Sequence, residues 1–233
     1  MRLAVNLWTI YGWMPGVPLS EGVLDELQKF GAEGIEIIMD EHHFAVDRLL
    51  DSQPEFSSYL RGHGLDVAGV ATGLFWKYNL GSQQPEVRER ALRIIRDECR
   101  LAQAYGAPVA LVVPGVQEPR TDYNQTYETA VETIRQGARY AAEYGVSIGL
   151  ENVATSFLQS PREFAQFLRD VDSPHVGVYL DLGNVLAARQ KYPENWIWAL
   201  GRYIACVHAK DYDEADTSIR GFRLCGQGSL DWT

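Results

Sequence analysis

The sequence predicts a single α/β domain built as a (β/α)₈ barrel, and two patterns lead to this fold class. Short, nearly continuous apolar runs such as VALVV and VGVYL alternate with longer amphipathic segments. Such runs are typical of parallel strands buried on both faces. Strict alternation of strands and helices predicts a parallel sheet with right-handed crossovers.

The alternation contains seven candidate strands. They are Leu3–Trp8, Gly34–Met39, Asp66–Ala71, Val109–Pro114, Ser147–Asn152, Val176–Leu182 and Ile204–Lys210. An open, doubly wound sheet normally carries a glycine-rich phosphate loop after an early strand, and neither GxGxxG nor GxxxxGK[ST] occurs here. The barrel is therefore favoured, with seven βα units present and an eighth strand and helix expected to be absent.

The helices between the strands have recognisable ends. Pro85 stands at a first-turn position, and Tyr127–Tyr144 is a helix ended by Gly145. Ser160 and Glu163 have the spacing of a capping box before another amphipathic helix. Because no low-complexity linker divides the chain, residues 1–233 are predicted to be one domain.

Composition excludes several classes of protein. The net charge is −10 and no cluster of Lys and Arg occurs, which argues against a nucleic-acid partner. No apolar stretch reaches the ~20 residues needed to cross a membrane. The three cysteines, Cys99, Cys206 and Cys225, contain no CxxC and are read as free thiols in a reducing compartment. A cytoplasmic protein without a membrane partner is expected.

Three polar residues stand at the ends of consecutive apolar strands. Glu151 ends SIGLE, Asp181 ends VGVYLD, and His208 lies in IACVHAKD. Catalytic groups of a (β/α)₈ barrel project from the carboxyl ends of its strands, so these side chains are expected to converge. Two carboxylates and an imidazole suit Mn²⁺, Mg²⁺, Co²⁺ or Zn²⁺. The alternative is that each residue makes an unrelated ion pair or hydrogen bond.

Five motifs in order carry a resemblance to a known family. They are GxEGIEI, LEN, DLGN, HAKD and LCGQGSLDW. Together they resemble the xylose isomerase-like TIM-barrel superfamily, in particular its sugar-phosphate isomerase/epimerase group, which includes D-tagatose 3-epimerase-like enzymes. The resemblance covers the whole chain.

The resemblance implies a metal site and a reaction. Glu151, Asp181 and His208 match three of the family's four metal ligands, and the fourth, a Glu on strand 8, is not in this chain. Asn184 stands where a substrate-contacting His is usual. The implied reaction is proton transfer through a metal-stabilised enediolate, with Glu151 as the catalytic acid or base.

Further residues near predicted strand ends are candidates for substrate binding. They are Asn6, Trp8, Glu36, Thr72, Trp76, Asn184, Lys210 and Arg220. For Glu36 and Lys210 the alternative is a structural ion pair. For the aromatic residues the alternative is packing.

The predicted function is a divalent-metal-dependent isomerase or epimerase of a ketose or sugar phosphate. The alternatives are an inosose dehydratase or hydroxypyruvate isomerase-type enzyme, and a non-catalytic sugar-binding barrel. An endonuclease IV-like enzyme is disfavoured by the five histidines and the acidic charge. The expected partner is a small sugar or sugar phosphate, and a homo-oligomer is left open.

Overall fold

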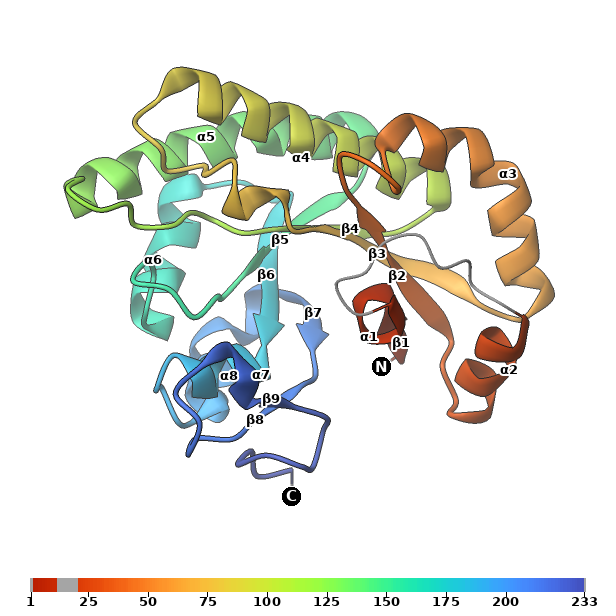
Figure 1. The fold of residues 1–233 in the computed structure, drawn as a ribbon. Helices are drawn as coiled ribbons and strands as arrows, with labels where there is room; N and C mark the ends of the chain where they lie inside the picture. The colour runs from red at the N-terminus through yellow and green to blue at the C-terminus, as the bar shows by residue number, and fades with distance from the viewer. Residues whose placement is uncertain (1, 12–20, 233) are drawn as a thin grey trace.

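The strands of this protein form one curled parallel sheet. The structure, a computed structural model, describes residues 2–11 and 21–232. The seven strands of the sheet follow each other in sequence order, β1 to β7, and every neighbouring pair is parallel (Figure 1). They are β1 (Ala4–Asn6), β2 (Gly34–Met39), β3 (Asp66–Thr72), β4 (Val109–Val112), β5 (Ser147–Glu151), β6 (Val176–Asp181) and β7 (Ile204–His208).

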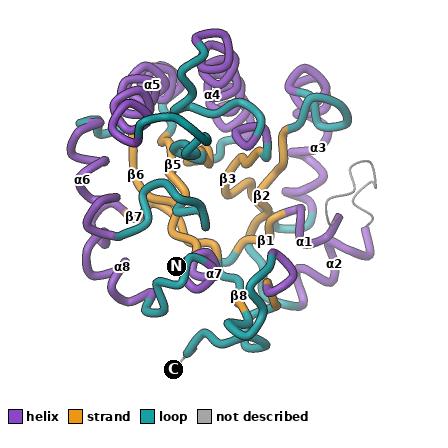
Figure 2. Tube along the Cα trace, turned by 60° about the vertical axis from the view of Figure 1, so that its left-hand side comes forward, coloured by secondary structure: helices purple, strands orange, loops and turns teal. Residues whose placement is uncertain are grey.

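Helices lie on the outside of the curled sheet. Figure 2 shows the strands around a central space, with the longer helices forming an outer ring. The helices are α1 (Leu7–Tyr11), α2 (Glu21–Lys29), α3 (Val46–Gly62), α4 (Pro85–Tyr105), α5 (Tyr123–Tyr144), α6 (Pro161–Val171), α7 (Leu182–Ala187) and α8 (Pro193–Leu200). The predicted barrel fold with seven βα units is confirmed. No helix of residues 2–11 and 21–232 is long and apolar enough to cross a membrane.

Several helix boundaries follow from local chemistry. Pro85 begins α4, and the side chain of Asp122 accepts a hydrogen bond from the backbone N–H of Gln125 at the start of α5. That helix therefore begins four residues before the predicted Tyr127, because Asp122 supplies an N-cap. The sequence patterns above do not predict α3, which contains Pro54 in its interior. Proline there removes a backbone hydrogen bond, and burial of the helix's apolar face outweighs that loss.

The apolar interior has two parts. The larger part lies between the helices and the outer face of the sheet. A small cluster occupies the inner face, formed by Ala71, Val109, Leu111 and Tyr179. Because side chains of a strand alternate between its faces, Tyr179 and Asp181 both point inward. The inner cluster is therefore the floor on which the polar residues at the strand ends rest.

A buried carboxylate organises the segment that follows β7. Asp211 begins β8 (Asp211–Tyr212), which pairs antiparallel with β9 (Phe222–Arg223). Its Oδ2 accepts hydrogen bonds from the backbone N–H groups of Gly226 and Gly228, each at 3.0 Å, and from the indole of Trp232 at 3.0 Å. Its Oδ1 accepts two more, from backbone N–H groups. These bonds lower the pKa of Asp211 against the effect of burial.

A second buried carboxylate lacks such partners. Glu98 of α4 is fully buried, and neither of its side-chain oxygens accepts a hydrogen bond from any described residue. Burial raises the pKa of Glu98 well above its usual value, and the negative charges of Glu36 and Asp97 add to the rise. Burial in the helix–sheet layer therefore favours the neutral form of Glu98.

We expect Glu98→Met to stabilise the fold by about 1–3 kcal/mol at pH 8, because it removes a polar group whose burial is uncompensated. A raised folded-state pKa means that wild-type stability falls as pH rises from the unfolded value near 4.5 through the folded value. The gain of the variant should therefore grow with pH in urea melts. The exposed Glu89 of the same helix serves as control. An equal gain at every pH, or none, would contradict the neutral state.

We expect Asp211→Asn to destabilise the protein by about 2–4 kcal/mol at neutral pH, because an amide nitrogen cannot accept the hydrogen bonds that one carboxylate oxygen receives. The lowered pKa means that this stability is present above the unfolded pKa and is lost as pH falls through the folded pKa. Thermal unfolding at pH 7 measures the difference. Asp25→Asn, at an exposed position of α2, should be neutral.

Candidate metal centre

Three polar side chains meet at the carboxyl ends of adjacent strands. Glu151 is the last residue of β5, Asp181 of β6 and His208 of β7. Asp181 and His208 are register partners across the β6–β7 ladder. Each of the three residues offers one ligand atom, and these atoms all lie within 4.8 Å of one another. The predicted convergence is therefore present in the structure.

The imidazole of His208 lies among three carboxylates. Its Nδ1 is 3.4 Å from Oε1 of Glu151 and 3.8 Å from Oδ2 of Asp181. Its Nε2 is 2.8 Å from Oε2 of Glu36 on β2. Burial lowers the pKa of His208, but the charges and hydrogen bonds of Glu36 and Glu151 outweigh it and raise the pKa well above the usual value.

Asp181 is fully buried, and its two side-chain oxygens have different partners. Oδ1 accepts a hydrogen bond of 2.7 Å from the backbone N–H of Asn184 and so caps α7. The side chain of Asn152 bonds the backbone N–H and C=O of Asp181, which fixes the strand end. No described residue donates a hydrogen bond to Oδ2, although Nζ of Lys210 lies 2.8 Å away as an ion-pair partner.

The pKa of the Glu151 carboxylate is raised. Burial raises its pKa, and the negative charge of Asp181 acts in the same direction, whereas the hydrogen bond and charge of His208 and the charge of Lys210 oppose the rise. Its Oε1 accepts a hydrogen bond of 3.3 Å from the side chain of Asn184. A general base works best when its pKa is moved towards the working pH, which is the direction seen here.

These residues fit a divalent cation. Two carboxylates and one imidazole nitrogen form a mixed oxygen and nitrogen donor set that first-row metals and Mg²⁺ accept. The buried Oδ2 of Asp181 supplies the second reason, because its close partner is already a cation, the ammonium of Lys210 at 2.8 Å. Buried carboxylates require compensating positive charge, and a divalent cation at the cluster would add to it.

The structure places four predicted substrate residues next to this cluster. Asn6 donates a hydrogen bond to Glu36, and Asn184 contacts Glu151. Lys210 lies on the Asp181 carboxylate and over the ring of Phe222, 4.3 Å from its centroid. Asn6, Glu36, Asn184 and Lys210 therefore form one polar layer with the three candidate ligands.

The other four predicted substrate residues have different surroundings. Trp8 packs against the inner apolar cluster, and its backbone N–H bonds the Asn6 side chain. The hydroxyl of Thr72 donates to the backbone C=O of Met39 and so ties β3 to β2. Trp76 is half exposed after β3, and Arg220 is exposed in the turn before β9.

Two functional neighbours are absent from the sequence prediction. The ring of Tyr179 lies 4.4 Å from that of His208, and its hydroxyl donates to Oε1 of Glu36. Asn152 holds the backbone of Asp181. Tyr179 could have been found from its spacing, because it stands two residues before Asp181 and must share its face of the strand.

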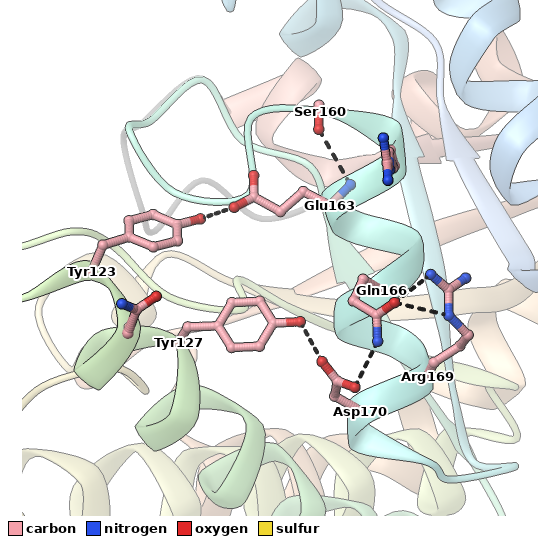
Figure 3. Close-up of a pocket in the computed structure, with 9 residues that line it drawn as sticks. Tyr123, Tyr127, Ser160, Glu163, Gln166, Arg169 and Asp170 are labelled. Atoms are coloured by element: carbon pink, nitrogen blue, oxygen red, sulfur yellow. Dashed lines mark hydrogen bonds between the residues drawn. The ribbon is translucent and has the colours of Figure 1, made fainter.

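A hollow on the outer surface lies away from these residues. It lies between α5 and α6 (Figure 3), where the hydroxyl of Tyr123 donates to Glu163 and that of Tyr127 donates to Asp170 at 2.7 Å. None of the predicted site residues lines it. Both carboxylates of the hollow already accept hydrogen bonds from tyrosine hydroxyls. Among its described residues, the hollow therefore has no group of metal-ligand atoms like that of Glu151, Asp181 and His208.

Comparison with known proteins agrees with the fold and the strand-end motifs. The family model described as xylose isomerase-like TIM barrel matches residues 24–233. The chain belongs to the xylose isomerase-like TIM-barrel family. The resemblance inferred from the five motifs is thereby confirmed.

Relatives of this xylose isomerase-like barrel include named sugar epimerases. A putative L-ribulose-5-phosphate 3-epimerase of Haemophilus influenzae is 24% identical over 214 residues, covering 87% of this chain and 72% of the relative. L-Ribulose-5-phosphate 3-epimerase of Escherichia coli is 22% identical over 201 residues, covering 84% and 70%. The chain spans between 58% and 72% of the length of these and two further curated relatives.

Solved structures show the same fold. A D-tagatose 3-epimerase-like protein superposes with a TM-score of 0.79 at 21% identity, covering 100% of this chain and 83% of that one. An L-ribulose 3-epimerase gives a TM-score of 0.74 at 17% identity, covering 99% and 74%. At these identities the likeness establishes the barrel architecture.

We expect metal-stripped protein to take up about one Mn²⁺, Co²⁺ or Zn²⁺ per chain, because the three ligand atoms form a single cluster. Asp181→Asn should weaken binding by more than about 100-fold, since loss of a ligand costs more than loss of a residue behind it. Equilibrium dialysis with elemental analysis measures both. Asp170→Asn, in the surface hollow, is the matched control. Wild-type protein that takes up none of these metals would exclude the centre.

Proposed function

We propose that the chain is a divalent-metal-dependent isomerase or epimerase of a ketose or ketose phosphate. One observation carries the proposal, which is the convergence of ligand atoms from β5, β6 and β7 within 4.8 Å. The names of the relatives, which act on ribulose phosphate, tagatose or ribulose, support the same class of substrate. A cation held by Glu151, Asp181 and His208 would supply Lewis acidity that polarises a substrate carbonyl and acidifies the neighbouring C–H.

The residues of the chain account for the proton transfer. Glu151 accepts the proton from the carbon next to the carbonyl and returns it, and its raised pKa suits both steps. Asn184 donates from its amide to Glu151 and so holds the carboxylate that performs the transfer. Return of the proton by Glu151 to the former carbonyl carbon, while the hydroxyl proton passes to the former carbonyl oxygen, gives an isomer. Epimerisation requires a second acid that delivers a proton to the opposite face of the same carbon, which Glu151 cannot do from its own face.

Two cations of the chain place the substrate oxygens. Lys210 is held by Asp181 on one side and by the ring of Phe222 on the other, so its ammonium has a fixed position beside the carboxylate cluster. Its remaining N–H bonds are suited to a hydroxyl or carbonyl oxygen. Arg220 stands on an exposed turn after β7, and its charge makes it the proposed partner of a substrate phosphate.

We expect Glu151→Gln to reduce exchange of solvent deuterium into a ketose by at least about 100-fold, because an amide cannot accept the proton. NMR in D₂O with D-tagatose, L-ribulose and L-ribulose 5-phosphate, each with added Mn²⁺, measures the exchange. The metal content of the variant is measured as well, so that loss of base and loss of ligand are separated.

The control and the opposing outcomes are distinct. Glu143→Gln changes an exposed carboxylate of α5 and should exchange at the wild-type rate. Wild-type protein that binds these sugars without exchange would replace the enzyme proposal by a sugar-binding barrel. Full exchange by Glu151→Gln would remove Glu151 from the mechanism.

A further inference from the structure

Glu36 is a charged residue inside the barrel that the proposed chemistry leaves without a task. It lies in the middle of β2, and only 3% of the residue is exposed. A buried carboxylate requires hydrogen-bond donors or a cation. Three other strands supply them, because Asn6 from β1, Tyr179 from β6 and His208 from β7 all bond its oxygens.

These bonds occupy both oxygens of Glu36. Oε1 accepts from the hydroxyl of Tyr179 at 2.5 Å, and Oε2 is bonded by Asn6 and by Nε2 of His208. The floor beneath is also closed, since a Cβ at Gly69 of β3 would lie 3.0 Å from Oε1. With so little exposure and so many bonds, Glu36 has no access to a substrate and acts through its neighbours.

The neighbour with a role at the metal centre is His208. Its Nε2 is held by Glu36 at 2.8 Å, and its ring packs against that of Tyr179. The opposite nitrogen, Nδ1, is the one that faces Glu151 and Asp181. The two ring nitrogens therefore have separate partners, and the orientation of the ring is fixed before any cation arrives.

We propose that Glu36, held by Asn6 and Tyr179, is a positioning residue that fixes His208 with Nδ1 as its ligand atom and so increases the affinity of the site for a divalent cation. The inference rests on the metal-dependent function proposed above. A ligating histidine commonly donates its other N–H to a carboxylate, which makes the imidazole a stronger ligand and fixes its tautomer. Here that carboxylate comes from β2, on the far side of the barrel from β7.

The affinity test compares metal-stripped full-length proteins by titration calorimetry with Mn²⁺ and with Zn²⁺. Glu36→Gln should weaken binding by about 10–100-fold. Tyr179→Phe, which removes only a hydroxyl that orients Glu36, should weaken it by about two- to tenfold. The control is Glu41→Gln, a carboxylate on the loop after β2 that pairs with Lys77 and Arg90 instead of a histidine. Its affinity should equal that of wild type.

A spectroscopic readout tests the geometry directly. In ¹⁵N-labelled wild-type protein with Zn²⁺, long-range ¹H–¹⁵N spectra should show His208 protonated at Nε2 and metal-bound at Nδ1. In the Tyr179→Phe protein the same tautomer should persist with a changed Nε2 shift. This measurement stands even if Glu36→Gln fails to fold.

The outcomes separate the two proposals. Wild-type protein that binds neither metal overturns the proposed function and this inference with it. Wild-type binding that is unchanged in a folded Glu36→Gln protein, or a zinc complex ligated through Nε2, overturns the inference alone. If Glu36→Gln is unfolded, unchanged affinity in Tyr179→Phe together with Nε2 ligation overturns it.

Discussion

Buried negative charge at the inner face of the sheet is the constraint on which the rest of the site depends. Glu36, Glu151 and Asp181 bring three carboxylates into a space floored by apolar side chains. Two basic groups, His208 and Lys210, compensate part of this charge. The layer keeps a net negative charge even when both are protonated. Burying charge in this way is unfavourable unless it is compensated, so the arrangement is suited to receiving a further cation.

Much of this layout can be predicted from the sequence, since it depends on periodicity. Apolar runs located all seven strands, and the rule that strand ends converge brought Glu151, Asp181 and His208 together. Strand β4 ends at Val112, two residues before the predicted end at Pro114. The helix containing Pro54 has no local signal that outweighs its proline, so only its packing reveals it.

Residues whose role depends on a tertiary contact cannot be predicted from sequence periodicity. Tyr179 stands in a run that appears purely apolar, and its hydroxyl matters only because Glu36 lies opposite it across the barrel. Asp211 belongs to the HAKD motif, yet four of its five hydrogen bonds come from residues at least 15 positions further along the chain. The local sequence around Tyr179 or Asp211 does not indicate these hydrogen-bond partners. The contacts form only when the strands and the segment after β7 pack together.

The helix cap supplied by Asp181 also bears on how this carboxylate would hold a cation. Because Oδ1 accepts a hydrogen bond from the first turn of α7, Oδ2 is the oxygen left to act as a ligand, which would favour monodentate binding. Ca²⁺ takes six to eight oxygen ligands and often uses carboxylates in bidentate fashion, whereas smaller ions such as Mg²⁺ and Mn²⁺ accept single oxygens and complete their shell with water or substrate. At the proposed centre, this six-residue helix would thus favour compact cations and leave coordination positions for water or substrate oxygens.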